Sequence, residues 1–320
     1  MKTIAVLTSG GDAPGMNAAI RAVVRAGIAM GMNVKGIHRG YSGLIDGDII
    51  DLDARSVSDI IHCGGTMLYT ARCPEFKTQE GIDKAVATCK KHGIEGIVVI
   101  GGDGSYRGAR DLSLAGVPCI GVPGTIDNDI SSTDYTIGYD TAMNTAMEMV
   151  DKLRDTSQSH ERCSVVEVMG RRAGYLALQT GIACGAVSIL VPEVEYDLDR
   201  DVIQKIKAIK KTGKKHFIVV VAEGIGGVEA IADRIEQATG IESRATILGH
   251  VQRGGSPTVR DRVMASQFGY RAVELLKDGI GNRVVTFREN KIGDQDIYEA
   301  LAMNKVFNID EYNMATAISI

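Results

Sequence analysis

The sequence predicts an α/β fold built on parallel β-sheets. Short runs of β-branched and other apolar residues recur along the chain and are separated by segments with helical periodicity. These runs are continuously apolar rather than alternating, which is typical of strands buried on both faces of a parallel sheet. The length of 320 residues is enough for about two domains. We therefore expect parallel sheets flanked by helices.

The strands and helices can be placed in order along the chain. The six predicted strands are Thr3–Leu7, Gly96–Ile100, Cys119–Val122, Val165–Val168, Ser188–Val191 and Phe217–Ala222. Two amphipathic helices are predicted, one from Tyr139 to Leu153 and one over Ala265–Leu276. No linker-like stretch separates these segments, so we expect short loops to join the domains.

Composition and charge exclude several functional classes. The 36 basic residues are outnumbered by 40 acidic ones, so no bulk charge attracts the protein to nucleic acid or to an anionic membrane. No apolar run approaches the roughly 20 residues that span a bilayer. The six cysteines form no C-x-x-C pair, which favours reduced thiols in a cytoplasm and argues against a zinc site. Any phosphate site must be built from local residues.

A glycine-rich segment, Thr8–Asn17, follows the first predicted strand and leads into a helix. Such a turn offers unpaired backbone N–H groups and a positive dipole end to an anion, and phosphate is the natural candidate. Gly10 and Gly15 have Walker A spacing, but Met16 and Asn17 stand where that motif needs Lys and Ser or Thr. The alternative is a turn that needs glycine only for its backbone geometry.

A second loop, Gly101–Ser105, repeats the Gly-Gly-Asp pattern after a later strand. Asp103 could coordinate Mg²⁺ while the bare glycine backbone approaches the phosphates that the ion bridges. The alternative is that Asp103 merely caps the next helix. Two such loops at the carboxyl ends of strands predict one crevice there, where open α/β sheets bind ligands.

The third loop, Val122–Ile130, carries two carboxylates in a segment that we expect to be exposed. Either Asp127 or Asp129 could accept a hydroxyl proton as that oxygen attacks phosphorus. An Asp with a reference pKa of about 3.9 is a weak base, so it would mostly position the nucleophile. The alternative is an Asx-rich turn with solvated acids.

Several cations stand near the glycine loops, where transferring and bound phosphates would need them. Arg21 and Arg25 lie one turn apart on the first helix, and Lys214 and Lys215 precede a strand. His250 could hydrogen-bond a sugar hydroxyl or a phosphate. Alone, a scattered Arg is usually a solvated surface residue, and a solvated helix face can carry the same basic pair. The remaining arginines of this kind are Arg72, Arg162, Arg171 and Arg244.

Five motifs together resemble those of bacterial ATP-dependent 6-phosphofructokinases. They occur in the order of that family and cover almost the whole chain, whose length matches the short bacterial subunit rather than the doubled eukaryotic one. The motifs are Thr8–Asn17, Gly101–Ser105, Pro123–Asp129, Met169–Arg171 and Gly249–Pro257.

The resemblance implies transfer of the ATP γ-phosphoryl group to the 1-hydroxyl of fructose 6-phosphate by a Mg²⁺-dependent, cytoplasmic homotetramer of glycolysis. Asp127 would accept the proton, while Thr125 and Arg171 would hold the phosphoryl group. Asp129 would help to set the electrostatics, and Asp103 would be the Mg²⁺ ligand. The residues expected to bind ATP are Gly11, Arg72, Cys73, Gly102, Asp103, Gly104, Ser105 and Gly108.

For the sugar phosphate, the resemblance implies a second set of residues. Arg162 and Arg244 would reach in from a neighbouring subunit, so the active site would be shared. Further sugar-phosphate contacts would come from Thr125, Asp127, Met169, Gly170, Arg171, Glu223, His250 and Arg253. The resemblance also implies two α/β lobes, each a mostly parallel sheet flanked by helices. Residues 1–138 plus 251–301 would form the ATP-binding lobe, and residues 139–250 plus 302–320 the sugar-phosphate-binding lobe.

Members of the family bind ADP as activator and phosphoenolpyruvate as inhibitor between subunits. The matching residues are Arg21, Arg25, Arg55, Asp59, Arg154, Gly185, Lys214 and Lys215. This chain departs from the pattern at Val187, where a Glu is usual, and at Thr212, where a basic residue is usual. Because valine cannot ligate a hard cation, we expect the two effectors to couple differently or weakly. Tyr175 stands where the enterobacterial pattern has Asp, and the sequence does not indicate what this difference changes.

Two alternative functions follow from the same residues. Pyrophosphate-using relatives commonly carry Asp and Lys where this chain has Gly104 and Gly124, and the small glycines leave room for a nucleoside, so ATP is predicted as donor. A non-catalytic nucleotide sensor would keep the glycine loops and lose the base, whereas Asp103, Asp127 and Arg171 are all present. The sequence therefore favours an ATP-dependent enzyme.

Overall fold

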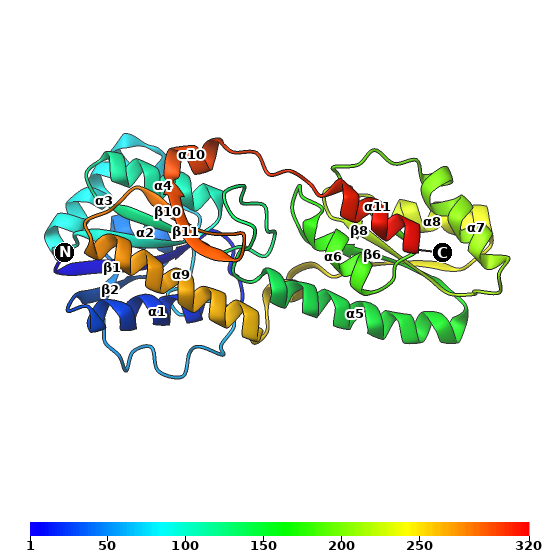
Figure 1. Cartoon of the computed structure of the whole chain (residues 1–320), viewed down its shortest axis with the longest axis horizontal. Helices are drawn as coiled ribbons and strands as arrows, with labels where there is room; N and C mark the ends of the chain where they lie inside the picture. The colour runs from blue at the N-terminus through cyan, green and yellow to red at the C-terminus, as the bar shows by residue number, and fades with distance from the viewer. Residues whose placement is uncertain (320) are drawn as a thin grey trace. The chain divides into compact units, whose positions relative to one another are not determined.

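The computed structural model describes residues 1–319 and confirms the predicted α/β class. The chain divides into two compact units. Unit 1 comprises Met1–Ile126, Ile130–Thr141 and Arg253–Lys305. Unit 2 comprises Asp127–Asp129, Ala142–Gln252 and Val306–Ile320. Each unit has its own β-sheet with helices on both faces (Figure 1).

Unit 1 contains a seven-stranded sheet in the order β11-β10-β5-β4-β1-β2-β3. The inner pairings are parallel, and the two outermost strands, β3 and β11, pair antiparallel with their neighbours. The predicted strands at the first three positions are confirmed as β1, β4 and β5. The strands are β1 (Thr3–Ser9), β2 (Asn33–Ile37), β3 (Ile49–Leu52), β4 (Gly96–Gly101), β5 (Cys119–Pro123), β10 (Arg283–Arg288) and β11 (Lys291–Asp296).

Helices cover both faces of this sheet. On one face, α1 (Met16–Ala29) and α9 (Val259–Lys277) pack against each other, as Figure 1 shows. The apolar core of the other face brings together side chains of the sheet, such as Leu7 and Val99, and of the remaining helices. Those helices are α2 (Gly40–Asp46), η1 (Glu75–Lys77), α3 (Gln79–His92), α4 (Asp103–Leu114) and α10 (Ile297–Ala302).

Unit 2 contains a four-stranded, fully parallel sheet in the order β7-β8-β6-β9. Its core is formed by valines and isoleucines of the central strands β6 and β8 and of the helices on one face. The strands are β6 (Cys163–Val168), β7 (Ser188–Leu190), β8 (Phe217–Ala222) and β9 (Ser243–Ile247). The helical segments are α5 (Tyr139–His160), α6 (Tyr175–Ala183), η2 (Asp199–Ile203), α7 (Gln204–Lys210), α8 (Val228–Thr239), η3 (Gly249–Arg253) and α11 (Ile309–Ile318).

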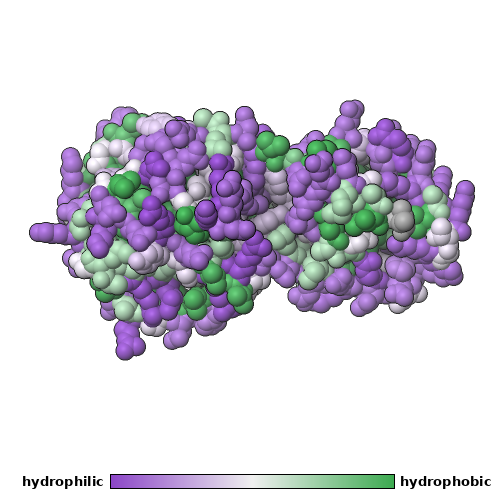
Figure 2. All heavy atoms as spheres, in the orientation of Figure 1, coloured by the Kyte–Doolittle hydropathy of each residue, from purple (hydrophilic) through white to green (hydrophobic). Residues whose placement is uncertain are grey.

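The surface is predominantly hydrophilic on the face drawn in Figure 2. Over residues 1–319, no helix has both the length and the apolar character needed to cross a membrane.

The predicted helix Tyr139–Leu153 extends two turns further, to His160, and its residues Ala142, Ala146 and Val150 are fully buried.

Candidate functional site

The three loops singled out from the sequence start at the same level of the unit 1 sheet. Ser9 at the end of β1 pairs with Gly101 at the end of β4, and Gly101 pairs with Pro123 at the end of β5. The chain proceeds from β1 toward β2 on one side and from β4 toward β5 on the other, so strand order reverses between β1 and β4. The carboxyl edge at such a reversal is where open α/β sheets bind ligands.

The first loop is held in place by a segment distant in sequence. The Asn17 side chain donates to the carbonyls of Cys63 and Gly64, at 3.2 and 3.1 Å, and accepts from the Met67 amide at 2.7 Å. The Thr70 hydroxyl donates to the Gly10 carbonyl at 2.7 Å. Asn17 is 3% exposed, so it supports the loop from within rather than facing a ligand. No pattern in the sequence indicates this role, because these partners lie about fifty residues away.

The same bonds place the predicted ATP residues that follow this segment. Arg72 is exposed, and Cys73 is half-buried against the core of unit 1.

Gly10 and Gly15 have φ angles of 89° and 104°, a left-handed conformation that requires glycine or strains another residue. The glycines of this turn therefore have a geometric role, which is compatible with anion binding by the backbone.

The second loop leads directly into α4. Gly102 is the N-cap and Asp103 is the first helical residue, so Asp103 is not the cap of this helix. The Asp103 side chain is 44% exposed and its Oδ2 lies 3.7 Å from Arg107. The Ser105 hydroxyl donates to the Ser9 carbonyl at 3.0 Å and thereby joins the first two glycine loops.

The glycines of this loop differ in their surroundings. A Cβ on Gly104 would meet no atom within 4 Å, so open space lies beside it. A Cβ on Gly108 would lie 2.6 Å from the Tyr41 ring, which packs on this buried glycine. The Tyr41 hydroxyl donates to the Ser105 carbonyl at 2.5 Å. Gly108 thus lets Tyr41 support the loop, whereas Gly104 leaves room at the surface.

Arg253 reaches the first loop from the far end of the sequence. Its Nη1 donates to the Asp12 carbonyl at 3.1 Å, and a Cβ on Gly11 would lie 2.5 Å from that same nitrogen. A residue expected to bind the sugar phosphate therefore lies directly against one expected to bind ATP. Both belong to unit 1.

We expect Gly11→Ala to lower kcat/KM by roughly tenfold to hundredfold, because the added methyl displaces the Arg253 guanidinium from its bond to Asp12. The range corresponds to loss of one charged hydrogen bond, about 1.5–3 kcal/mol. The thermal midpoint should barely change, since the displaced group is the end of a flexible side chain. Steady-state kinetics check this, and Arg253→Ala should add little in the Gly11→Ala background. Full activity of Gly11→Ala would contradict the assignment.

The third loop is buried, so the expectation that it is exposed is wrong. Thr125 is 8% and Asp127 4% exposed. The neighbouring Ile126 and Ile130 are buried anchors, and the Thr136 hydroxyl donates to the Thr125 carbonyl at 2.6 Å. Asn128 has φ 49°, a strained left-handed conformation. Buried carboxylates and strained backbone of this kind cluster at functional sites.

The carboxyl edge of the unit 2 sheet carries five of the predicted sugar-phosphate residues. Val168 at the end of β6 pairs with Ala222 at the end of β8, and Glu167 pairs with Ile247 at the end of β9. Met169, Gly170 and Arg171 follow β6, Glu223 follows β8, and Gly249 and His250 come just after β9, beyond Leu248. The structure therefore brings this set together at one edge.

Arg171 occupies a strained position at that edge. Its φ is 61°, and its amide donates to the Glu223 carboxylate. Its side chain is 71% exposed and its Nη1 lies 4.0 Å from Asp129. Gln252, fully buried and not predicted, accepts from the Met169 amide at 3.3 Å and donates to the Gly249 carbonyl at 3.1 Å. The loops after β6 and β9 are thus joined, with an exposed guanidinium presented to solvent.

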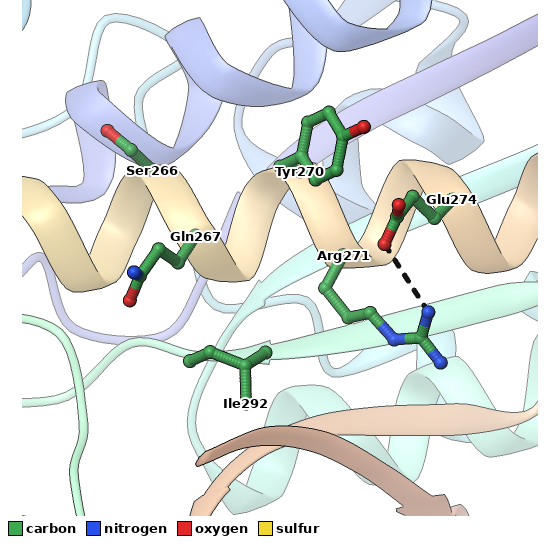
Figure 3. Close-up of a pocket in the computed structure, with 6 residues that line it drawn as sticks. All are labelled: Ser266, Gln267, Tyr270, Arg271, Glu274 and Ile292. Carbon is green, nitrogen blue, oxygen red and sulfur yellow. Dashed lines mark hydrogen bonds and ion pairs between the residues drawn. The ribbon is translucent and has the colours of Figure 1, made fainter. Parts of the chain in front are cut away.

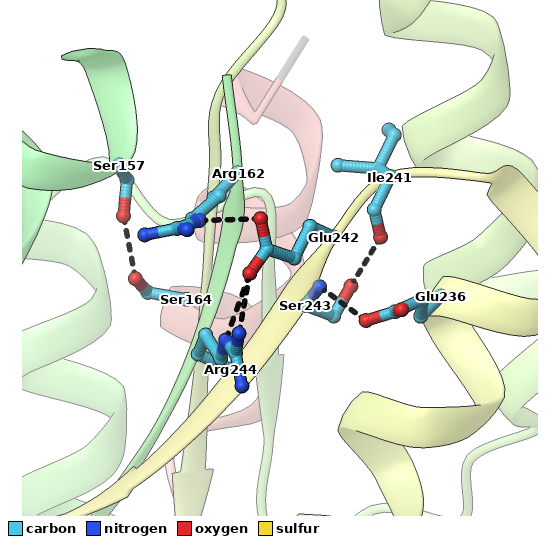
Figure 4. Close-up of polar contacts among 8 residues, drawn as sticks. All are labelled: Ser157, Arg162, Ser164, Glu236, Ile241, Glu242, Ser243 and Arg244. Atoms are coloured by element: carbon cyan, nitrogen blue, oxygen red, sulfur yellow. Dashed lines mark hydrogen bonds and ion pairs between the residues drawn. The ribbon is translucent and has the colours of Figure 1, made fainter. Parts of the chain in front are cut away.

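Arg162 and Arg244 lie at the opposite, amino edge of this sheet, just before β6 and at the start of β9. One carboxylate, Glu242, accepts from both: from Arg162 at 2.7 Å and from Arg244 at 2.6 Å (Figure 4). The hydrogen bonds from these two guanidinium groups lower the pKa of Glu242. The structure therefore does not bring Arg162 and Arg244 to the carboxyl edge, where the other sugar-phosphate residues of unit 2 lie.

The predicted effector residues are distributed over both units. Arg21 and Arg25 lie on α1, while Arg55 and Asp59 lie on the loop after β3. In unit 2, Arg154 donates to the Cys184 carbonyl beside Gly185. Lys215 forms an ion pair with Glu161 at 2.6 Å, at the amino edge of the sheet.

Charges of this amino edge act on His216. Its pKa is lowered by burial and by the positive charges of Lys214 and Arg154.

Val187 is 2% exposed and packs in the core of unit 2, so its side chain is not available to a ligand. Tyr175 packs against Phe307, with ring centroids 5.8 Å apart, and burial raises its pKa to about 12. Thr212 is exposed, and its hydroxyl donates to the Ile209 carbonyl at 2.8 Å.

A cavity of about 490 Å³ lies elsewhere in unit 1, between α9 and β11. In Figure 3 the Arg271 guanidinium points toward Glu274 beside it, and Ile292 stands below. None of its lining residues belongs to the predicted site: Ser266, Gln267, Tyr270, Arg271, Glu274 and Ile292. The one cation of this lining, Arg271, is already paired with Glu274 and Asp294.

Comparisons with known proteins find relatives that align with the full length of the chain. The phosphofructokinase family model matches residues 3–276. The ATP-dependent 6-phosphofructokinase of Bacillus cytotoxicus is 59% identical over 320 residues, covering 100% of both chains. The enzyme of the same name from Clostridium botulinum is 58% identical over 319 residues, also covering 100% of both chains.

Solved structures show the same fold. A phosphofructokinase structure from Saccharomyces cerevisiae has a TM-score of 0.89 at 35% identity, covering 99% of this chain. This chain spans 47% of that yeast chain. A pyrophosphate-dependent phosphofructokinase from Marinobacter aquaeolei has a TM-score of 0.86 at 23% identity, covering 97% of this chain and 86% of its own; this likeness shows the fold alone.

Proposed function

The chain belongs to the phosphofructokinase family, as its motifs predict, and we propose that it transfers the γ-phosphoryl group of ATP to the 1-hydroxyl of fructose 6-phosphate. The products are fructose 1,6-bisphosphate and ADP, and the reaction belongs to glycolysis. The observation that carries this proposal is the 58–59% identity, over full length, to ATP-dependent 6-phosphofructokinases. The three polar loops that start level on adjacent strands supply the matching chemistry.

In the proposed reaction, the Asp127 carboxylate accepts the proton of the sugar hydroxyl as that oxygen attacks the γ-phosphorus. The bond between the γ-phosphorus and the bridging oxygen breaks, and ADP leaves with that oxygen. Thr125 and Arg171 hold the transferring group, where a fixed hydroxyl and guanidinium stabilise the charge of the transition state. Asp129, 4.0 Å from Arg171, orients the guanidinium.

On the nucleotide side, the glycines of the first two loops allow backbone N–H groups to approach the phosphates, and Arg72 supplies a cation. Over residues 1–319 no group of three His, Cys, Asp or Glu residues could hold a metal ion by itself. A single exposed carboxylate, Asp103, fits Mg²⁺ that is bound mainly through substrate phosphates. Asp103 would hold the ion, which would supply positive charge to offset that of the phosphates.

On the sugar side, we propose that Glu223, His250 and Arg253 contact fructose 6-phosphate together with Met169 and Gly170. Arg162 and Arg244 act on the site of a neighbouring subunit of a homotetramer. Their position at the amino edge of the sheet, away from Glu223 and His250, supports that role.

We further propose that the basic residues of α1 and of the unit 2 amino edge bind ADP and phosphoenolpyruvate, with altered coupling because Val187 is a core residue.

The donor is tested by initial rates on fructose 6-phosphate with Mg·ATP and, separately, with pyrophosphate. We expect turnover with ATP and a much lower kcat/KM with pyrophosphate, because open space for a nucleoside lies beside Gly104. Gly124 does not leave the room that the sequence predicts, since a Cβ there would lie 3.1 Å from Ile100 and 3.2 Å from Met16. A higher kcat/KM with pyrophosphate would refute the donor assignment. A panel of acceptors tests the rest: only a phosphorylated ketose should be consumed, and binding of ATP without any turnover would favour a nucleotide sensor.

A further inference from the structure

A buried carboxylate near the start of α9 is not used by the proposed chemistry. Asp261 has no exposed surface. Its Oδ1 accepts from the Gly138 amide at 2.7 Å and from the Tyr135 hydroxyl. Its Oδ2 accepts from the Thr141 amide at 2.8 Å and from the Thr141 hydroxyl. Burial raises the pKa of Asp261, and these four hydrogen bonds each act in the opposite direction.

These donors lie within one short segment, residues 135–141, which we name the clamp segment. The clamp segment holds the third loop. The Thr136 hydroxyl donates to the Thr125 carbonyl at 2.6 Å, and the Ile137 amide donates to the Pro123 carbonyl at 2.9 Å. Gly124 and Ile137 also form a β-bridge. The backbone on both sides of Gly124 is therefore fixed by Thr136 and Ile137, which lie between two residues that donate to Asp261, Tyr135 and Gly138.

The clamp segment also packs on the first glycine loop. A Cβ on Gly138 would lie 2.7 Å from the Cβ of Ala13, and a Cβ on Gly15 would lie 2.7 Å from the Ile137 side chain. Such close approach leaves little freedom for the loop to shift relative to the clamp segment. One carboxylate thus fixes a segment that lies against both the nucleotide loop and the Thr125 loop.

We propose that Asp261 is a positioning residue for phosphoryl transfer: through the clamp segment it sets the place of Thr125 relative to the first glycine loop. The inference rests on the proposed function, because it takes Thr125 to hold the transferring group. A displacement of about 1 Å at a reacting group can cost a factor of 10² in rate. A fully satisfied buried network is suited to such fixation, and a partly satisfied one is not.

The test is Asp261→Asn, which keeps the side-chain shape but replaces one acceptor oxygen by a donor NH₂ group. We expect kcat per folded molecule to fall tenfold to a hundredfold. The effect should disappear in a Thr125→Ala background, because both changes act on the same step. A general loss of structure would instead multiply the two effects. Additive effects, or an unchanged kcat per folded molecule, would overturn the proposal.

The matched control is Asp294→Asn. Asp294 is also a mostly buried carboxylate of unit 1, paired with Arg271 and Arg283 at 2.7 Å, but it makes none of the contacts of the clamp segment. It should lower stability without coupling to Thr125. If Asp261→Asn does not fold, Tyr135→Phe removes one of the four donors and is judged by the same criterion: coupling to Thr125 supports the proposal, and additivity overturns it.

Backbone hydrogen exchange gives a readout that needs no activity. Asp261→Asn should speed exchange of the amides over residues 123–141 and leave those of β10 and β11 unchanged. Unchanged exchange over 123–141 would overturn the inference even in an active enzyme. Wild-type protein that fails to phosphorylate fructose 6-phosphate would overturn the proposed function instead, so the two failures are distinguishable.

Discussion

Asp127→Asn should lower kcat by a factor of about 10²–10⁴, the range that general acid–base groups contribute to transfer reactions. The amide keeps the size of the side chain but cannot accept the hydroxyl proton as the oxygen attacks. Asp127 is 4% exposed, so solvent cannot readily replace the carboxylate. KM for ATP should change little, because the proposed role begins only when the sugar hydroxyl reacts. Steady-state kinetics with both substrates measure both quantities.

The control for this variant is Asp134→Asn. Asp134 is an exposed carboxylate close in sequence and is not one of the proposed catalytic or binding residues, so kcat should stay within twofold of wild type. Thermal unfolding of both variants shows whether the fold is retained. A folded Asp127→Asn enzyme with near wild-type kcat would contradict the role of Asp127 as proton acceptor.

Arg171→Ala should lower kcat/KM by about 10²–10³, the loss found when one preorganised group that stabilises transition-state charge is removed. Stability should stay within about 1 kcal/mol of wild type, because the side chain is 71% exposed and its pairing with Asp129 at 4.0 Å is weak. Arg171→Lys should recover part of the activity, since it restores the charge but not the planar guanidinium. Kinetics and thermal unfolding of the three proteins check this.

Arg172 is the matched control for that experiment. It is also exposed and is the next residue in the chain, so Arg172→Ala changes net charge equally at nearly the same place. Its kcat/KM should match wild type. Equal losses in Arg171→Ala and Arg172→Ala would indicate a general electrostatic effect rather than a specific contact of Arg171.

The sequence was sufficient for the features that depend on local pattern. Continuous apolar runs predicted β1, β4 and β5, and the glycine-rich turns after them predicted the loops at one edge. The edge strand β11 was missed because its residues are only partly buried and its sequence, Lys291–Asp296, carries mostly polar residues. A strand is recognised in a sequence by its run of buried apolar residues, and an edge strand has fewer buried residues.

The supporting residues could not be predicted for a different reason. Asn17, Asp261 and Gln252 each bond to partners between about 50 and 120 positions away or to loops of other strands. Single-sequence reasoning has no access to such long-range pairs. The burial of the Thr125–Asp127 segment was also missed, because a polar sequence indicates exposure unless other residues cover its backbone, as Thr136 and Ile137 do here.

The pairing of Ser9 with Gly101, and of Gly101 with Pro123, constrains how the chain can change in length. Each strand residue advances the chain by about 3.3 Å. Deleting one residue within β4 would pull its loop back by that distance relative to its two neighbours, or invert which side chains face the core. Substitutions within these strands can be absorbed by repacking, whereas insertions and deletions cannot. We therefore expect changes in chain length to be tolerated in connections remote from this edge, such as the Glu289–Asn290 turn between β10 and β11.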